Sequence, residues 1–506
     1  MPNSGSQRWH NCIYGQESEM IEVGVTCADG SAGTMKLPVQ SPSKILEYLI
    51  HHCGLHLPDS LVANFWEHLD NMGDEWALST KRFRQACAQQ VWPVGIYGDE
   101  ACIGLINAPT NQIYGIVLSL PLFRPKVTRV AKYLLFSIES DRVLNMQATL
   151  YPVFRYITDN LNQLAENGLN GRRFLVSELR GDQAWFRNIF QHASWWRKKE
   201  VCFRCQACTN QNHLNYLHYD DWISTRRSTE EFLFEELPQE MCPLVDLYFF
   251  HVSLIKHCTL HILNLGLLGV SNGSTLGMLV HMHVWGRLDD DDDWPRVLNA
   301  AFDDFVQWRK IHKVQCSQKR FTYKTVNRKD YGHFLNAKGY NARVLSEWLL
   351  AKIVEIRANP GNLILDERFD LTESTMRGVN RYFGLTERAS RKLTLEQSQQ
   401  IEEAGKAYLV GYRSLNYMST RSGILAWVLV PKWHAFAHVL VDYVRLLRQN
   451  PRYVHTFGDE DMMMVLKGWA KNVKSKPREV GILKLSRMRM KTLQWRIPEL
   501  RGHNRV

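Results

Sequence analysis

The spacing of hydrophobic residues changes several times along the chain. After a mixed, turn-rich lead-in over residues 1–43, apolar residues recur every three or four positions over residues 44–90, which predicts helices. Four short apolar runs follow, and each predicts a β-strand: 91–97, 112–120, 132–139 and 172–178. Residues 145–166 carry the helical period again, so the order is strand, strand, strand, helix, strand. This order predicts a mixed sheet with flanking helices in an α/β (α+β) fold.

The second half of the chain has a mainly helical pattern. Helices are predicted at 297–310, 342–356, 395–413 and 433–448. Five consecutive aspartates at 289–293 predict a solvated loop, because adjacent like charges repel one another. The chain therefore divides into four predicted regions, which are a lead-in and helical region at 1–90, the first part of an α/β core at 91–200, a mainly helical insertion at 201–450, and a final core helix with a basic end at 451–506.

The overall composition is that of a globular protein. The 506 residues are 45% hydrophobic and 22% charged, which excludes a wholly disordered, collagenous or small disulfide-bonded chain. The eleven cysteines are odd in number and the first residues carry no apolar secretory signal, so we expect an intracellular protein with reduced thiols. The longest apolar runs are far shorter than the ~20 residues of a membrane helix, so the hydropathy predicts no membrane partner.

The positive charge is concentrated at one end of the chain. The formal net charge is +11, and residues 467–506 contain twelve Lys and Arg against two acids, which is 12 − 2 = +10. Such a basic segment predicts a polyanionic partner, nucleic acid first and an acidic membrane surface second. A solvated tail or a solubilising helix face is the alternative. The stretch KNVKSKPR at 471–478 is also a weak candidate for a nuclear localisation signal.

Two aspartates follow predicted strands. Asp99 lies just after the first strand and Asp182 a few residues after the fourth, and a glycine that permits a tight turn precedes each. If these strands are neighbours, both carboxylates emerge at one edge of the sheet, where they could bind divalent metal. Paired Mg²⁺ ions ~3.5–4 Å apart stabilise the attacking and leaving oxygens of a phosphoryl displacement. Two ordinary turn aspartates are the alternative.

Cysteine and histidine pairs with metal-ligand spacing lie in the insertion. Cys202 and Cys205 are separated by two residues, as in a zinc knuckle, and Cys258 and His261 repeat this spacing fifty residues later. Together they predict a Cys₃His zinc site that stabilises the segment. A set of buried free thiols with a hydrogen-bonded histidine is the alternative, and the spare candidate ligands are Cys208, His213 and His251.

The order of these elements resembles the ribonuclease-H-like core of DDE/D transposases and integrases. In that family the first acid lies on or just after strand one, the second follows strand four, and the third lies on a later helix, often beyond a large helical insertion. The resemblance implies that the predicted sheet is ribonuclease-H-like and that the helical region interrupts it.

Short motifs in a fixed order are similar to those of the CACTA (EnSpm-like) transposases. The motifs are PVGIYGDEACIG and QIYGIVLSLPLF around the first acid, then Asp182, the pair Cys202 and Cys205, the pair Cys258 and His261 with the apolar stretch 262–269, and PKWHAFAH at 431–438. The resemblance covers roughly residues 91–475, and it extends to multicopy transposon-derived proteins of protist genomes. The Asp-Gly or His-Asp wording of the group's first motif is missing from this chain.

The resemblance also implies a third catalytic carboxylate. Glu460 takes the place of the glutamate that opens the last core helix; Asp459 and Asp461 adjoin it, and Glu347 is a rival. An acid at a helix N-terminus, favoured by the macrodipole, is the alternative interpretation of Glu460.

A DDE-type transposase is the implied function. Asp99, Asp182 and Glu460 would hold two Mg²⁺ or Mn²⁺ ions for DNA cleavage and strand transfer, with double-stranded DNA as the partner and the nucleus as the location. Whether the chain forms a homo-oligomer is open. The alternatives are a catalytically inactive, transposase-derived DNA-binding or scaffold protein, and a ribonuclease-H-like nuclease without strand transfer.

Overall fold

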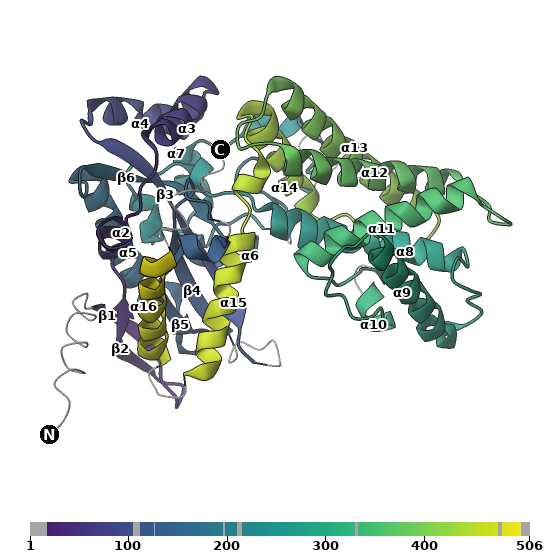
Figure 1. Ribbon diagram of the computed structural model, residues 1–506, viewed down its shortest axis with the longest axis horizontal. Coiled ribbons are helices and arrows are strands. Elements are labelled where there is room, and N and C mark those ends of the chain that lie inside the picture. Colours follow the sequence, from purple (N-terminus) through teal and green to yellow (C-terminus); the bar gives the residue numbers. More distant parts are fainter. Residues whose placement is uncertain are drawn as a thin grey trace. The chain divides into compact units, whose positions relative to one another are not determined.

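The computed structural model describes residues 18–104, 112–125, 127–195, 198–209, 215–328, 332–473 and 478–496. The chain divides into two compact units (Figure 1). Unit 1 comprises Met1–Ala193, Ser228–Lys256 and Thr456–Val506, and unit 2 comprises Ser194–Arg227 and His257–His455. The chain therefore leaves unit 1 twice and returns to it each time.

A four-stranded mixed sheet lies at the centre of unit 1. Its strands are β3 (Gln90–Cys102), β4 (Gln112–Ser119), β5 (Lys132–Glu139) and β6 (Arg172–Arg180). The spatial order is β5-β4-β3-β6, in which β3 is antiparallel to β4 and parallel to β6. The first and fourth predicted strands are thus neighbours. The predicted mixed α/β class is confirmed.

Helices cover both faces of this sheet. On one face lies α5 (Tyr151–Glu166), which follows a π-helical turn, η4 (Met146–Leu150), and places Phe154 edge-on against Phe136 of β5. These two elements match the helix predicted at 145–166. On the other face α15 (Phe457–Asn472) and α16 (Arg478–Arg496) pack against the sheet, and Figure 1 shows both helices in front of β4 and β5. The core beneath them includes Tyr97, Val117, Leu134, Met463 and Leu466.

The N-terminal part of unit 1 adds a hairpin and three helices. The hairpin pairs β1 (Glu19–Thr26) with β2 (Ala32–Val39) in antiparallel register. The helical period over residues 44–90 corresponds to three helices, which are α2 (Pro42–His51), α3 (Asp59–Asn71) and α4 (Glu75–Ala86). A further short helix, α6 (Gln183–Phe190), follows β6.

Unit 2 is mainly helical. Its longer elements are η9 (Leu260–Leu267), α8 (Leu268–His281), α9 (Trp294–Ile311), α11 (Gly339–Ala358), α12 (Glu367–Arg388), α13 (Leu395–Arg421), α14 (Lys432–His438) and η11 (Val439–Leu446). The four helices predicted from periodicity are therefore confirmed. Leu260–His281 is apolar and long enough to cross a membrane by those two criteria, but 94% of its most apolar window is buried, as in a core helix.

Part of the basic C-terminal segment is built into unit 1. In α16, Ile482 and Leu483 are buried in the core, and the Glu479 carboxylate pairs with Arg142 at 3.1 Å. Arg478 pairs with Glu139 of β5. A solvated tail is therefore the wrong interpretation for residues 478–496. Residues 474–477 and 497–506 of this segment lie outside the described residues.

Candidate functional site

Two groups of side chains have the composition of metal sites. The first begins in the sheet of unit 1, where Tyr97 and Asp99 lie on the face covered by α15. Tyr97 is in register with Arg180 of the parallel neighbour β6. Asp99 and Asp182 each lie two residues beyond this registered pair. The fold thus brings both predicted aspartates to the same end of two adjacent strands.

The position of Asp99 differs from the prediction in one respect. Asp99 does not follow the strand but lies inside it, because β3 continues to Cys102 and pairs Asp99 with Gly115 of β4. Gly98 is needed for space rather than for a turn. A Cβ atom at Gly98 would lie 1.9 Å from the ring of Trp185, and one at Gly181 would lie 2.7 Å from the same ring. The two glycines therefore leave room for the Trp185 ring of α6, which packs against Gly98 on the face of the sheet opposite Asp99.

A tyrosine hydroxyl joins the first acid to the third. The Tyr97 hydroxyl lies 2.8 Å from Asp99 Oδ2 and 2.8 Å from Glu460 Oε1. Burial raises the pKa of Tyr97 well above its ordinary value, and the negative charges of Asp99 and Glu460 raise it further. The hydroxyl therefore keeps its one proton and can donate it to only one of the two carboxylates at a time.

Among the candidate third acids, Glu460 is the one beside Asp99. It lies in the first turn of α15. Asp459 is buried and paired with Lys132 and Arg180, and Asp461 accepts a hydrogen bond from Thr128 Oγ1 at 3.0 Å. Glu347 lies on α11 in unit 2 and pairs with Arg343 at 3.2 Å.

Asp182 has a structural role as the N-cap of α6, which agrees with the alternative interpretation of this residue as an ordinary turn aspartate. Its carboxylate caps α6 by accepting a hydrogen bond from the Trp185 backbone N–H at 2.6 Å. Asp182 also influences Glu100, whose pKa is raised by burial and, among other causes, by the negative charge of Asp182. Capping uses Oδ1 and leaves Oδ2 as the oxygen that could serve as a ligand.

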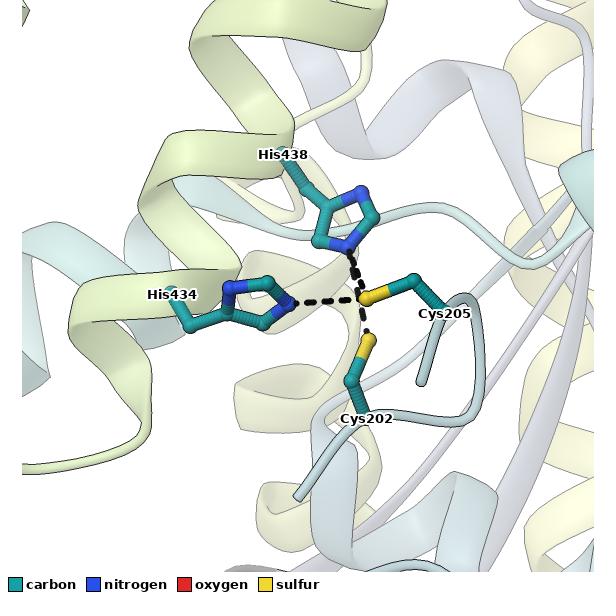
Figure 2. A group of neighbouring side chains, drawn as sticks. All are labelled: Cys202, Cys205, His434 and His438. Atoms are coloured by element: carbon teal, nitrogen blue, oxygen red, sulfur yellow. Dashed lines mark hydrogen bonds between the residues drawn. The ribbon is translucent and has the colours of Figure 1, made fainter. Parts of the chain in front are cut away.

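The second group lies wholly within unit 2 and is buried. Cys202 and Cys205 come from a short turn, and His434 and His438 come from α14 (Figure 2). Histidines four residues apart lie on one face of a helix, so both rings point at the same place. One ligand atom from each of the four side chains lies within 4.8 Å of each of the others.

The distances in this group suit a tetrahedral ion. Cys202 Sγ lies 3.4 Å from His438 Nε2, and Cys205 Sγ lies 3.2 Å from His434 Nε2 and 3.5 Å from His438 Nε2. Bonds of ~2.3 Å to sulfur and ~2.0–2.1 Å to nitrogen, at a tetrahedral angle, place the two ligand atoms about 3.6 Å apart. The four side chains are therefore close to the arrangement of a tetrahedral metal site.

Neighbouring side chains hold these four residues in place. Asp442 Oδ2 lies 2.8 Å from His438 Nδ1, and Arg226 and Arg204 pair with the same carboxylate. Such a carboxylate fixes the orientation of a ligating imidazole. On the cysteine side, the Arg227 guanidinium donates to the carbonyl oxygens of both cysteines.

The charges of the group favour a thiolate. Burial alone would raise the pKa of Cys202, but a hydrogen bond from Cys205 and the positive charge of His438 hold it well below its ordinary value. Burial opposes the charged form of His438, yet the Cys202 thiolate and Asp442 raise its pKa. The pKa of His434 is lowered, mainly by burial, which favours the neutral imidazole.

Two of the four predicted zinc ligands are not members of the Cys₂His₂ group. Cys202 and Cys205 are brought together as predicted, but His434 and His438, rather than Cys258 and His261, complete the group. The reason is that α14 places two imidazoles on one helical face. The spare candidates Cys208 and His251 are not members of the group either, and His213 lies outside the described residues. The signal that could have identified the second pair is the histidine spacing in PKWHAFAH.

Comparison with known proteins gives no indication of function, so function must be inferred from the two groups of side chains. No protein-family model matches the chain, and no curated protein is significantly similar to it. Within the described residues, the two groups are the buried Cys₂His₂ group of Cys202, Cys205, His434 and His438, which could hold a metal ion, and the acids Asp99 and Glu460, which meet at the Tyr97 hydroxyl.

Proposed function

We propose that unit 1 is the catalytic core of a DDE-type, transposon-derived DNA transposase. The observation that carries the proposal is that Asp99 and Glu460, 460 − 99 = 361 residues apart in sequence, meet at the Tyr97 hydroxyl on a sheet of order β5-β4-β3-β6. Asp182 stands at the corresponding end of the adjacent strand. No local propensity brings Glu460 to this place, because the chain between β6 and α15 passes through unit 2.

The residues fit a pair of divalent cations. Asp99 and Glu460 both accept from the Tyr97 hydroxyl, and a divalent cation bound between these two like charges would offset their repulsion. We assign Asp99, Asp182 and Glu460 as the ligands of two Mg²⁺ or Mn²⁺ ions. Bound ions of this kind stabilise the charge on the attacking and leaving oxygens of a phosphodiester.

Zinc is the ion we propose for the Cys₂His₂ group. Two thiolates and two imidazoles at these separations form a closed tetrahedral set of the type used in structural zinc sites. Such an ion would join the turn at Cys202 and Cys205 to α14, which are more than 200 residues apart in sequence. Its role is therefore to stabilise unit 2 rather than to take part in chemistry.

Double-stranded DNA is the proposed substrate, with the nucleus as the location. The support is the net charge of +11, most of which is carried by residues 467–506. Lys471 and Lys484 are exposed in this region, whereas Arg478 is committed to an ion pair with Glu139. DNA affinity without sequence preference is the expected contribution of such exposed lysines.

The alternative proposal is an inactive, transposase-derived DNA-binding or scaffold protein. It is favoured by the use of Asp182 as the cap of α6, at 2.6 Å from the Trp185 N–H. A nuclease without strand transfer is a further variant of the enzyme proposal. Cleavage and joining must therefore be measured separately from binding.

The test is cleavage of supercoiled plasmid and of linear duplexes in Mg²⁺ and in Mn²⁺. We compare wild type with Asp99→Asn, Asp182→Asn and Glu460→Gln, and use Asp461→Asn as a matched control on the same helix. The proposal expects each of the first three variants to lose at least about 100-fold in cleavage rate, as expected when transition-state charge stabilisation is removed. Asp461→Asn should cleave normally, and all variants should bind DNA in the presence of chelator. Full DNA binding with no divalent-dependent cleavage by wild type would favour the scaffold.

A further inference from the structure

The residue that precedes Glu460 is held by two cations. Asp459 Oδ1 lies 2.7 Å from Lys132 Nζ and 2.9 Å from Arg180 Nη2, and the Asp459 side chain is only 1% exposed. Lys132 belongs to β5 and Arg180 to β6, which are the two outer strands of the sheet. One carboxylate from α15 is therefore tied to both edges of the sheet beneath it.

The sheet is built to bring these groups together. Ser119 of β4 pairs in register with Lys132 and with Gly95, and Gly95 pairs with Glu178 of β6. This row crosses all four strands. A Cβ atom at Gly95 would lie 2.8 Å from Ser119 Oγ and 2.9 Å from Glu178 Cγ. The glycine thus leaves room for the polar side chains on either side of it.

Arg180 connects the rest of the row. Its Nη2 donates to Ser119 Oγ at 2.6 Å, and its Nη1 pairs with Glu178 at 3.1 Å. With Lys132 and Asp459, the cluster contains two cations and two carboxylates and is electrically neutral. Buried ion pairs contribute little net stability because desolvation opposes them, and specifying one arrangement is a role they can have instead.

The first turn of α15 needs contacts that fix its orientation. The helix begins where the chain re-enters unit 1, and Thr456 provides no side-chain cap. Successive residues on an α-helix point about 100° apart, since 3.6 residues make one turn. Fixing Asp459 toward the two outer strands therefore fixes the direction in which Glu460 leaves the helix, toward Tyr97 and Asp99.

We infer that Asp459 is a positioning residue, whose ties to Lys132 and Arg180 set Glu460 in place to bind divalent metal with Asp99. This inference rests on the proposed function, and it adds a residue that contacts neither metal nor DNA. It predicts that the contacts of Asp459 with Lys132 and Arg180, and not only the net charge of the cluster, determine the affinity of Asp99 and Glu460 for divalent metal.

The experiment separates the effect of the contacts between Asp459 and the two cations from the effect of the net charge of the cluster. Lys132→Met/Asp459→Ala removes one cation and one carboxylate, so the cluster stays neutral while the tie is lost. Asp459→Asn keeps an acceptor oxygen toward both cations but removes the charge. The control is Asp461→Ala, two residues further along the same helix and exposed. Mn²⁺ binding to the zinc-loaded full chain is titrated by electron paramagnetic resonance, and thermal unfolding is followed by circular dichroism.

The double variant is expected to unfold near the wild-type temperature and to bind Mn²⁺ at least about tenfold more weakly, the usual cost of losing a supporting group around a metal site. Asp459→Asn should be the less stable variant but should bind Mn²⁺ more tightly than the double variant does. Wild-type Mn²⁺ affinity in the folded double variant would overturn the inference. If the double variant does not fold, wild-type Mn²⁺ affinity in the single variant Asp459→Ala, which also loses both contacts, would overturn it instead.

The same titration distinguishes this inference from the proposed function. If wild type binds no Mn²⁺, or if Glu460→Gln binds it as tightly as wild type, the proposed function fails. If those two proteins behave as expected and the double variant binds like wild type, only the positioning role of Asp459 fails.

Discussion

The two metal-type groups in this molecule are organised in opposite ways. In unit 2, four donors of the Cys₂His₂ group already lie within 4.8 Å of one another and are supported by Asp442 and Arg227. In unit 1, Asp99 and Glu460 are joined through one hydroxyl, and their support is the ion cluster around Asp459. A closed donor set suits an ion that stays, whereas an open carboxylate edge suits ions that bind with a substrate.

Loss of a zinc ligand should have the largest effect. Cys205→Ser leaves a buried, incomplete donor set, so we expect unit 2 to lose roughly 3 kcal/mol or more of unfolding free energy together with its zinc. The measurement combines elemental analysis with chemical denaturation. Cys258→Ala is the matched control, because Cys258 is also buried but does not belong to the group. Zinc loss in the control and retention in Cys205→Ser would instead make Cys258 the ligand.

Alkaline pH should change the stability of unit 1 through Lys132. Burial, followed by the charge of Arg180, lowers the pKa of Lys132 from 10.5 to about 8. The unfolded chain therefore holds this proton more tightly, and stability rises as the pH increases from about 8 to about 10.5. Relative to Lys132→Met, the wild type should gain up to about 3 kcal/mol across this window. Denaturation at a series of pH values checks this, and parallel curves for the two proteins would contradict it.

Removing the support of a zinc ligand should cost less than removing the ligand. Asp442→Asn takes away the carboxylate that orients His438, and a loss of about 10–100-fold in zinc affinity is expected. Competition with a chromogenic chelator measures the affinity. Asp304→Asn, an acid elsewhere in unit 2, serves as the control. Equal affinity in both variants would show that His438 does not depend on Asp442.

Neutralising one acid of unit 1 should slightly stabilise the protein without divalent metal. Glu460→Gln relieves the repulsion between two carboxylates that share the Tyr97 hydroxyl, so we expect a gain of about 0.5–1 kcal/mol in chelator. The same substitution should remove the stabilisation that Mn²⁺ gives to wild type. Thermal unfolding with and without Mn²⁺ tests both parts. A destabilised variant that still responds to Mn²⁺ would place the ion elsewhere.

Salt dependence of DNA binding should show the smallest effect. Replacing exposed Lys471 and Lys484 by Ala should flatten the log–log slope by about 0.9 for each phosphate that the protein no longer neutralises. Lys36→Ala, exposed on the β1–β2 hairpin, is the control. Point substitutions are preferable to deletion of the C-terminal segment, because Ile482 and Leu483 are part of the core. An unchanged slope would place the DNA surface elsewhere.

The sheet of unit 1 can be predicted from sequence because its strands are short apolar runs. Runs at 91–97 and 172–178 correspond to β3 and β6, whereas their adjacency is implied only by the resemblance to a known family. By contrast, α8 gives no periodic signal because nearly all of its residues are buried, which leaves no polar face to create a helical period. Burial of α16 is also hidden in the sequence, since its many basic residues conceal two core positions.

The sites can be predicted only in part, for a similar reason. Cys202 and Cys205 are close in sequence and are recognisable by their spacing, but their partners His434 and His438 come from more than 200 residues away. Glu460 is identified by resemblance and not by pattern. The role of Tyr97 cannot be predicted, because a tyrosine in an apolar strand looks like any other core residue until the fold places two carboxylates beside it.

Anomalous X-ray scattering from crystals soaked in MnCl₂, with data at the manganese and zinc edges, tests the central claim most directly. The account predicts a manganese peak within about 2.0–2.6 Å of oxygens of Asp99 and Glu460, as for hard divalent cations. It also predicts a separate zinc peak among Cys202, Cys205, His434 and His438. A zinc peak in unit 2 with no manganese beside Asp99 and Glu460 would contradict the proposed catalytic site.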